Sequence, residues 1–166
     1  MRILFTGGGT AGHVTPNIAL IKRLLAEGWQ VDYVGSKTGI ERELIAGVPG
    51  VTDHAISSGK LRRYFSWQNF ADPFRIVRGV FEARRLIRAC KPDVIFSKGG
   101  YVSVPVVVAA GKTPVVAHES DFSPGLANRI AARYADRVCV TFADTARHIS
   151  GGRAVHTGTP IRPELY

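Results

Sequence analysis

The chain has 166 residues, 45% of them hydrophobic, which is enough for one compact domain with a substantial core. No apolar run reaches the roughly 18 residues of a membrane span and the start of the chain is too short for a signal peptide, so we expect a cytoplasmic protein. The net charge of +9 is concentrated between residues 57 and 91, where nine basic residues accompany two acidic ones, and this excess predicts an anionic ligand or surface beside that region.

Apolar segments of strand character alternate along the chain with segments of helical character. The expected strands cover residues 2–6, 31–35, 51–57, 93–97, 114–119, 137–141 and 154–158. The expected helices cover residues 16–27, 38–46, 72–90, 103–111, 124–135 and 143–149, and three of them are expected to begin at a proline: Pro16, Pro73 and Pro124. The alternation predicts an α/β fold, a doubly wound, Rossmann-like parallel sheet. In such sheets, ligands bind beyond the carboxyl ends of the strands.

The first glycine-rich turn, GGGTAGHVTP at residues 7–16, separates an expected strand from an expected helix. Bare backbone N–H groups in such a turn bind phosphate, helped by the positive end of the helix. Its glycines also have the G-x-G-x-x-G spacing of a dinucleotide site, which requires an acidic residue at the end of the second strand. Asp32 lies inside that strand instead, and Pro16 delays the expected helix. We therefore favour a different phosphate and keep a nucleotide-dependent oxidoreductase as the minor alternative.

A second glycine-rich turn, SKGGYVSVP at residues 97–105, follows the fourth expected strand. Taken alone, Gly99 and Gly100 are more readily explained as ordinary turn glycines. Beside the first turn, however, they favour a second phosphate-binding element. We expect the two turns to lie at neighbouring strand ends, where they hold a pyrophosphate between them.

Four motifs follow one another along the chain: GGGTAGHVTP, KPDVIFSKGGYVSVP, HESDFSPGLANR and GTPIR. Together they resemble the MurG glycosyltransferases, from residue 1 to about residue 162. The resemblance implies a two-domain GT-B enzyme that transfers N-acetylglucosamine from UDP-N-acetylglucosamine to lipid I, an undecaprenyl-linked acceptor, and so makes lipid II for peptidoglycan. It also implies that residues 1–157 form the amino-terminal, acceptor-binding half and that residues 158–166 begin an interdomain linker.

This resemblance covers only half of such an enzyme. The chain alone is therefore expected to lack full activity and to need a carboxyl-terminal, donor-binding domain, in cis or in trans. A non-catalytic alternative is a membrane-docking subunit that recruits a separate donor-binding chain.

The candidate catalytic base is His13. The positive end of the helix that follows favours a neutral imidazole, which can accept the proton of an attacking sugar hydroxyl. The alternative is a histidine that only binds backbone at a helix start. By resemblance, His13 is the leading candidate for deprotonating the acceptor hydroxyl, and Glu119, at the end of the fifth expected strand, is the second.

By resemblance, further residues bind the acceptor diphosphate and the sugars. The residues expected at the diphosphate are Gly8, Gly9, Thr10, Ala11, Gly12, Gly99, Gly100, Tyr101 and Ser103. The residues expected at the sugars are Asp121, where the family more often has an asparagine, and Asn128. A carboxylate at position 121 accepts hydrogen bonds from sugar hydroxyls but donates none. The alternatives are a packing role for Tyr101 and a solvent-facing position for Asn128.

The sequence contains no D-x-D pair and no His/Cys cluster, so we expect neither a metal nor another cofactor in this domain. By resemblance, helix dipoles and side chains stabilise the departing UDP instead. The two cysteines, Cys90 and Cys139, lie far apart in sequence and are expected to be reduced thiols.

Residues 57–85 interleave aromatic side chains with arginines. This combination suits an anionic membrane surface, and it predicts a peripheral protein on the inner face of the cell membrane. The residues expected to contact the membrane are Arg62, Arg63, Trp67, Phe70, Phe74, Arg75 and Arg78. Single-stranded nucleic acid can use the same chemistry, but nothing else resembles a nucleic-acid module, and we expect no such partner. The remaining alternative is an ordinary amphipathic helix with its aromatic residues in the core.

Overall fold

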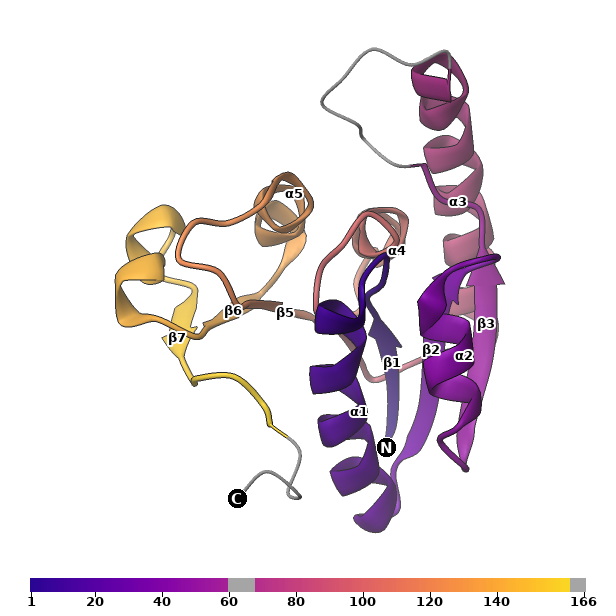
Figure 1. Ribbon diagram of the computed structural model, residues 1–166, viewed down its shortest axis with the longest axis horizontal. Helices are drawn as coiled ribbons and strands as arrows, with labels where there is room; N and C mark the ends of the chain where they lie inside the picture. Colours follow the sequence, from indigo (N-terminus) through magenta and orange to yellow (C-terminus); the bar gives the residue numbers. More distant parts are fainter. Residues whose placement is uncertain (60–67, 162–166) are drawn as a thin grey trace.

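Seven parallel strands form one sheet in the order β3-β2-β1-β4-β5-β6-β7 (Figure 1). The structure is a computed structural model that describes residues 1–59 and 68–161, without the side chains of residues 68–71. The strands are β1 (Arg2–Thr6), β2 (Gln30–Ser36), β3 (Val51–Ile56), β4 (Val94–Ser97), β5 (Val115–Glu119), β6 (Arg137–Val140) and β7 (Ala154–His156). The expected strands and the doubly wound sheet are confirmed. The strand order reverses between β1 and β4, which makes this the switch point at which ligands bind in such sheets.

Helices cover both faces of the sheet (Figure 1). On one face, α1 (Ala11–Ala26) and α2 (Ile40–Ala46) pack over a core that includes Phe5 and Ile21. On the other face, α3 (Gln68–Cys90), α4 (Ser103–Ala109) and α5 (Leu126–Tyr134) pack over a core that includes Leu4 and Ile95. Leu4 and Phe5 enter different cores because successive side chains of a strand point to opposite faces. A 3-10 helix, η1 (Ala143–His148), lies between β6 and β7.

The expectation that three helices begin at prolines is wrong. α1 and α3 both begin earlier, at Ala11 and Gln68, so Pro16 and Pro73 lie inside these helices. α5 begins at Leu126, after Pro124. Pro16 and Pro73 are each the sixth residue of their helix, beyond the first four N–H groups that have no partner within a helix, so each removes one intrahelical hydrogen bond. A proline therefore marks the start of a helix only to within about one turn or two. As a result His13 lies within the first turn of α1 rather than before it.

Tyr33 ties the centre of the sheet to the first glycine turn. Its fully buried hydroxyl donates to the carbonyl oxygen of Gly7 at 2.7 Å and accepts from Nδ2 of Asn17 on α1 at 3.3 Å. Burial raises the pKa of Tyr33 well above its usual range, so the phenol is protonated and donates at neutral pH. The start of the turn is thus fixed from β2 and from α1 together.

Replacing Tyr33 by phenylalanine removes this tie without leaving a large void. We expect the free energy of unfolding to fall by about 1–3 kcal/mol, because the Gly7 carbonyl and the Asn17 amide lose a partner in the interior. Urea denaturation measures the difference. The matched control is Tyr134→Phe, whose side chain is 49% exposed and whose loss of a hydroxyl should change stability by less than about 0.5 kcal/mol. Equal stability of the two variants would contradict the role of Tyr33.

Candidate active site

The two glycine turns lie in contact at the switch point of the sheet. β1 and β4 pair in parallel up to Thr6 and Ser97, so the turns that follow start side by side. A Cβ placed on Gly100 would lie 2.1 Å from the carbonyl oxygen of Gly8, and Gly100 has a φ of +81°. Only glycine adopts this positive φ without strain and has no Cβ to clash with the Gly8 oxygen. The expectation that the turns occupy neighbouring strand ends is confirmed, and the two backbones touch.

A buried carboxylate that sequence analysis missed closes one side of the first turn. Oε2 of Glu41, on α2, accepts from the backbone N–H of Gly9 at 3.2 Å, and Oε1 accepts from the N–H and the hydroxyl of Ser36 at 2.8 and 2.6 Å. Burial opposes ionisation of Glu41, but hydrogen bonds from Ser36 and Gly9 lower its pKa overall, so it is charged at neutral pH. The N–H of Gly9 is therefore already hydrogen-bonded and is not free for the diphosphate expected at this turn.

The residues at the start of α1 are open to a ligand. Thr10 is the N-cap residue of α1, makes no capping hydrogen bond with its side chain and is exposed, as are Ala11 and Gly12. The first N–H groups of a helix lack partners within the helix and attract anions. Three of the residues expected at the diphosphate thus stand where a phosphate meets free backbone donors.

His13 stands between the two turns with one ring nitrogen fixed. Its Nδ1 lies 3.3 Å from the carbonyl oxygen of Lys98, in the second turn. A carbonyl only accepts, so Nδ1 carries the proton and Nε2 of the neutral ring keeps its lone pair. Burial, together with the charge of Lys98, lowers the pKa of His13, so the ring is neutral at pH 7. The alternative role of His13, a hydrogen bond to the backbone, is thus present as the bond to the Lys98 carbonyl. The same bond sets the tautomer that a general base requires.

Lys98 is a second residue that sequence analysis missed. It is 1% exposed, and its Nζ hydrogen-bonds to Oγ of Ser120, after β5. Burial lowers the pKa of Lys98, while the charges of Glu119 and Asp121 oppose this shift. A cation is thereby held beside His13 and the two acidic residues. The lysine lies inside the SKGG motif, but nothing in the sequence marks it as buried.

Glu119 holds the turn after β5 and the start of α5 together. It is 3% exposed, and its oxygens accept from the N–H of Asp121 and from Nδ2 of Asn128, both at 2.8 Å. Asn128 is buried, so its alternative as a solvent-facing residue is wrong. Asp121 is exposed. Both carboxylate oxygens of Glu119 already accept hydrogen bonds. Glu119 is therefore better suited to hold Asp121 and Asn128 in position than to accept a proton from a ligand.

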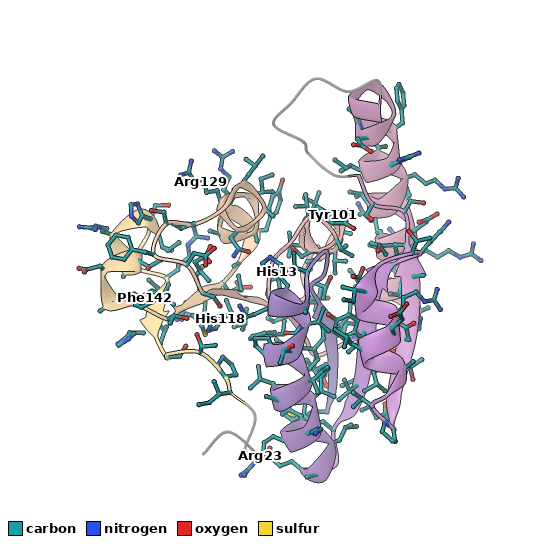
Figure 2. The ribbon with its side chains drawn as sticks, viewed as in Figure 1. His13, Arg23, Tyr101, His118, Arg129 and Phe142 are labelled. Carbon is teal, nitrogen blue, oxygen red and sulfur yellow. The ribbon has the colours of Figure 1, made fainter. Side chains whose placement is uncertain are left out.

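The remaining expected residues lie in the second turn. The ring of Tyr101 lies over Gly9, where a Cβ would approach Cε1 of the ring to 2.5 Å, and Figure 2 shows Tyr101 beside His13 at the same end of the sheet. Ser103 is buried, and its hydroxyl donates to the carbonyl oxygen of Gly100 at 2.8 Å. Gly99 has a φ of +95°. The buried Ser103 side chain therefore stabilises the second turn by this internal hydrogen bond.

A polar cavity of about 420 Å³ opens beside the first turn, between the ends of β2 and β3 and helix α3. Three cations (Lys37, Arg75 and Arg78) line it together with Asp72, Tyr101 and serine side chains. Arg78 is paired with Glu82 at 2.9 Å, whereas Lys37 lies 3.9 Å from the same carboxylate. Arg75 lies 3.5 Å from the carboxylate of Asp72, so each of the three cations has an acidic neighbour, and the anionic partner stays a prediction.

The outer face of α3 carries exposed apolar residues among arginines. Phe74 is 80% exposed, Val77 55% and Phe81 71%, and their spacing places them on one face of the helix. The alternative that the aromatic residues of this helix fill the core is therefore wrong for Phe74 and Phe81. Arg62, Arg63 and Trp67, and the side chain of Phe70, lie outside the described residues. Among the helices that are described, none is long and apolar enough to cross a bilayer.

The dinucleotide alternative lacks the acidic residue that it needs. Asp32 lies near the amino-terminal end of β2, and its carboxylate is bound by Arg2 and His54, at 2.6 and 2.7 Å. It is 1% exposed and lies at the end of the sheet opposite to the glycine turns. It is therefore not available to a ribose bound there.

A Rossmann-like parallel sheet with paired glycine turns at its switch point defines the class, the amino-terminal domain of the GT-B glycosyltransferase fold. Residues 3–140 match the glycosyltransferase family 28 N-terminal domain, and the chain belongs to this family.

Relatives and solved structures agree with this assignment. The chain is 57% identical over 166 residues to a Clostridium botulinum (strain Langeland) protein named UDP-N-acetylglucosamine--N-acetylmuramyl-(pentapeptide) pyrophosphoryl-undecaprenol N-acetylglucosamine transferase, and 54% identical over 167 residues to the protein of the same name from Clostridium tetani. These matches cover 99% of the chain and 47% and 46% of the relatives, so the chain spans about half their length. The crystal structure of Acinetobacter baumannii MurG matches 98% of the chain and 46% of its own, with a TM-score of 0.80 and 29% identity. A UDP-N-acetylglucosamine 2-epimerase from Listeria monocytogenes, at 12% identity and a TM-score of 0.71, shares the fold.

Removing the charge of Lys98 tests the electrostatic coupling within the site. In Lys98→Met the backbone carbonyl that binds His13 stays, while the positive charge that lowers the pKa of His13 is gone, so this pKa should rise. A pH titration of the His13 ring resonance by NMR, in the chain as it stands, measures it. Lys98→Arg keeps the charge and should leave the pKa close to the native value. A pKa in Lys98→Met that equals or falls below the native one would contradict the coupling.

Proposed function

We propose that the chain is the acceptor-binding half of an enzyme that transfers N-acetylglucosamine from UDP-N-acetylglucosamine to lipid I in peptidoglycan synthesis. The names of the relatives and the family of the chain support this proposal. The observation that carries it is the position of His13, whose ring is neutral, has a fixed tautomer and lies at the switch point beside open helix N–H groups.

The proposed chemistry begins with the acceptor diphosphate at the start of α1, against Thr10, Ala11 and Gly12. The acceptor hydroxyl gives its proton to Nε2 of His13 while its oxygen forms a bond to the anomeric carbon of the donor sugar, and the bond from that carbon to the UDP oxygen breaks. Glu119 positions Asp121 and Asn128 toward the sugars. The donor itself is held by a further domain, in cis or in trans, which brings the reactants into the geometry that the reaction requires.

The cavity beside the first turn fits the polar remainder of the acceptor. Its three cations, Lys37, Arg75 and Arg78, suit an anionic group. Asp72, which also lines it, can accept hydrogen bonds from hydroxyls of the same ligand. Arg75 and Arg78 belong to α3, whose exposed Phe74 and Phe81 suit the interfacial region of a bilayer. In this proposal, α3 contacts the membrane and a lipid-linked acceptor extends from there past the cavity, which Tyr101 lines, toward His13. We place the protein on the inner face of the cell membrane for this reason.

Removing the imidazole of His13 tests whether this residue is the general base. In a complete enzyme that contains this domain, His13→Ala should lower kcat about 10²–10⁴-fold, because no other group takes the proton at this position. The KM for the acceptor should change little, since the backbone donors stay. His13→Gln keeps a hydrogen bond without a titratable base and should be as slow as His13→Ala. Wild-type kcat in either variant, at saturating acceptor, would show that the base lies elsewhere.

Membrane binding tests the role of α3. Each cation near an anionic surface contributes about 1 kcal/mol, so the double variant Arg75→Gln/Arg78→Gln should bind vesicles of anionic lipid about thirtyfold more weakly. The difference should shrink as salt is added. Sedimentation with vesicles measures binding. The charge-matched control is Arg133→Gln/Arg137→Gln, on exposed residues of α5 and β6, which should bind as the native chain does. If both double variants lose the same affinity for the vesicles, the effect comes from net charge and not from the position of Arg75 and Arg78 on α3.

A further inference from the structure

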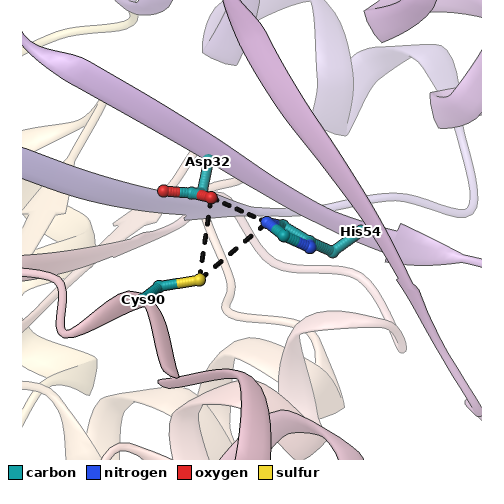
Figure 3. A group of neighbouring side chains, drawn as sticks. All are labelled: Asp32, His54 and Cys90. Carbon is teal, nitrogen blue, oxygen red and sulfur yellow. Dashed lines mark hydrogen bonds and ion pairs between the residues drawn. The ribbon is translucent and has the colours of Figure 1, made fainter. Parts of the chain in front are cut away.

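A cluster of three metal-binding side chains lies at the end of the sheet opposite to the glycine turns (Figure 3). Asp32 comes from β2, His54 from β3 and Cys90 is the last residue of α3. His54 pairs in register with Val34, two residues after Asp32, so both side chains point to the α3 face of the sheet. These residues are 22 and 36 positions apart in the sequence, which is why sequence analysis found no cluster.

The geometry of this cluster is close to that of a zinc site. Oδ1 of Asp32 lies 2.7 Å from Nε2 of His54 and 3.7 Å from Sγ of Cys90, and Sγ lies 4.0 Å from Nε2. Zinc binds oxygen and nitrogen at about 2.0–2.2 Å and thiolate at about 2.3 Å, so tetrahedral ligand atoms stand about 3.3–3.7 Å apart. The three side chains reach this spacing if the O–N edge lengthens and the S–N edge shortens, each by less than about 1 Å.

Arg2 orients the carboxylate of Asp32 in this cluster. Its Nε donates to Oδ2 of Asp32 at 2.6 Å, and its Nη2 reaches Oδ1 at 3.2 Å. The stronger contact is thus on Oδ2, which leaves Oδ1 facing His54 and Cys90. A hydrogen bond of this kind to a metal-binding carboxylate is the usual support for a metal ligand.

We propose that Asp32, His54 and Cys90 bind one zinc ion, with water as the fourth ligand. The side chain of His54 is 23% exposed and Cys90 is half-buried, so an ion can enter from solvent. On binding, Oδ1, Nε2 and Sγ each form a bond to Zn²⁺, the proton of the Cys90 thiol passes to solvent and the proton of His54 moves to Nδ1. The ion joins β2, β3 and the end of α3. It lies away from the glycine turns, so it stabilises the fold and takes no part in glycosyl transfer.

The test uses the tag-free chain, stripped with a chelator and titrated with Zn²⁺ and with Co²⁺. We expect one zinc ion per chain by calorimetry, a rise of the thermal midpoint on zinc addition, and a Co²⁺ spectrum with the strong near-ultraviolet band of thiolate coordination. Cys90→Ser should lose the band and bind zinc at least tenfold more weakly, and His54→Asn should bind it at least tenfold more weakly. The matched control is Cys139→Ser, the other half-buried thiol, which should behave as the native chain.

The proposal fails if the native chain binds no zinc, because the cluster is then only a hydrogen-bonded tie between the strands and α3. It also fails if the thiolate band persists in Cys90→Ser or disappears in Cys139→Ser, because the metal then sits at another cysteine. Circular dichroism of each variant shows that it is folded before its metal binding is compared.

Discussion

Where β1 and β4 end, the carbonyl oxygen of Gly8 approaches Gly100 so closely that no side chain fits between them. The contact brings two turns that are about ninety residues apart in sequence into one structure. It places the Lys98 carbonyl within reach of His13, and the ring of Tyr101 over Gly9. A bulkier residue at Gly100 would separate the two turns, and the polar groups that each turn carries would no longer lie together, whereas one at Gly8 would clash with the carboxylate of Glu41.

Charge is distributed around this centre in a way that keeps the imidazole uncharged. Glu41, buried and ionised, stands behind the first turn, and its charge is balanced by hydrogen bonds rather than by a cation. Lys98, also buried, stands on the other side, near Glu119 and Asp121. Burial is the main cause that lowers the pKa of His13, and the charge of Lys98 lowers it further, while the charges of Glu119 and Asp121 oppose this shift more weakly. A neutral imidazole beside the open start of α1 is therefore a product of burial and of the surrounding charges together.

The features that follow local rules were the ones that the sequence predicted. The strands of the sheet were found from apolar runs, and the two glycine turns were found because glycines between a strand and a helix indicate a turn whose backbone N–H groups can bind phosphate. Pro16 misled because a proline near a helix start is tolerated over more than one position. Glu41 and Lys98 were missed because their importance arises from burial and from partners across the fold. The cluster of Asp32, His54 and Cys90 was missed for the same reason. Strand register brings Asp32 and His54 together, and the crossover helix α3 brings Cys90 to them.

The direction of α3 has a consequence for how an acceptor finds the site. α3 connects two parallel strands, so it runs against them, and its first turns project beyond the carboxyl ends of the sheet (Figure 1). The exposed Phe74 lies in this projecting part, at the same end of the molecule as His13. If this end rests on a bilayer, the site stands at a fixed height above the lipid headgroups. A lipid-linked acceptor then arrives by diffusion in two dimensions, and its encounter rate follows its density per unit area of membrane rather than its concentration in the cell volume.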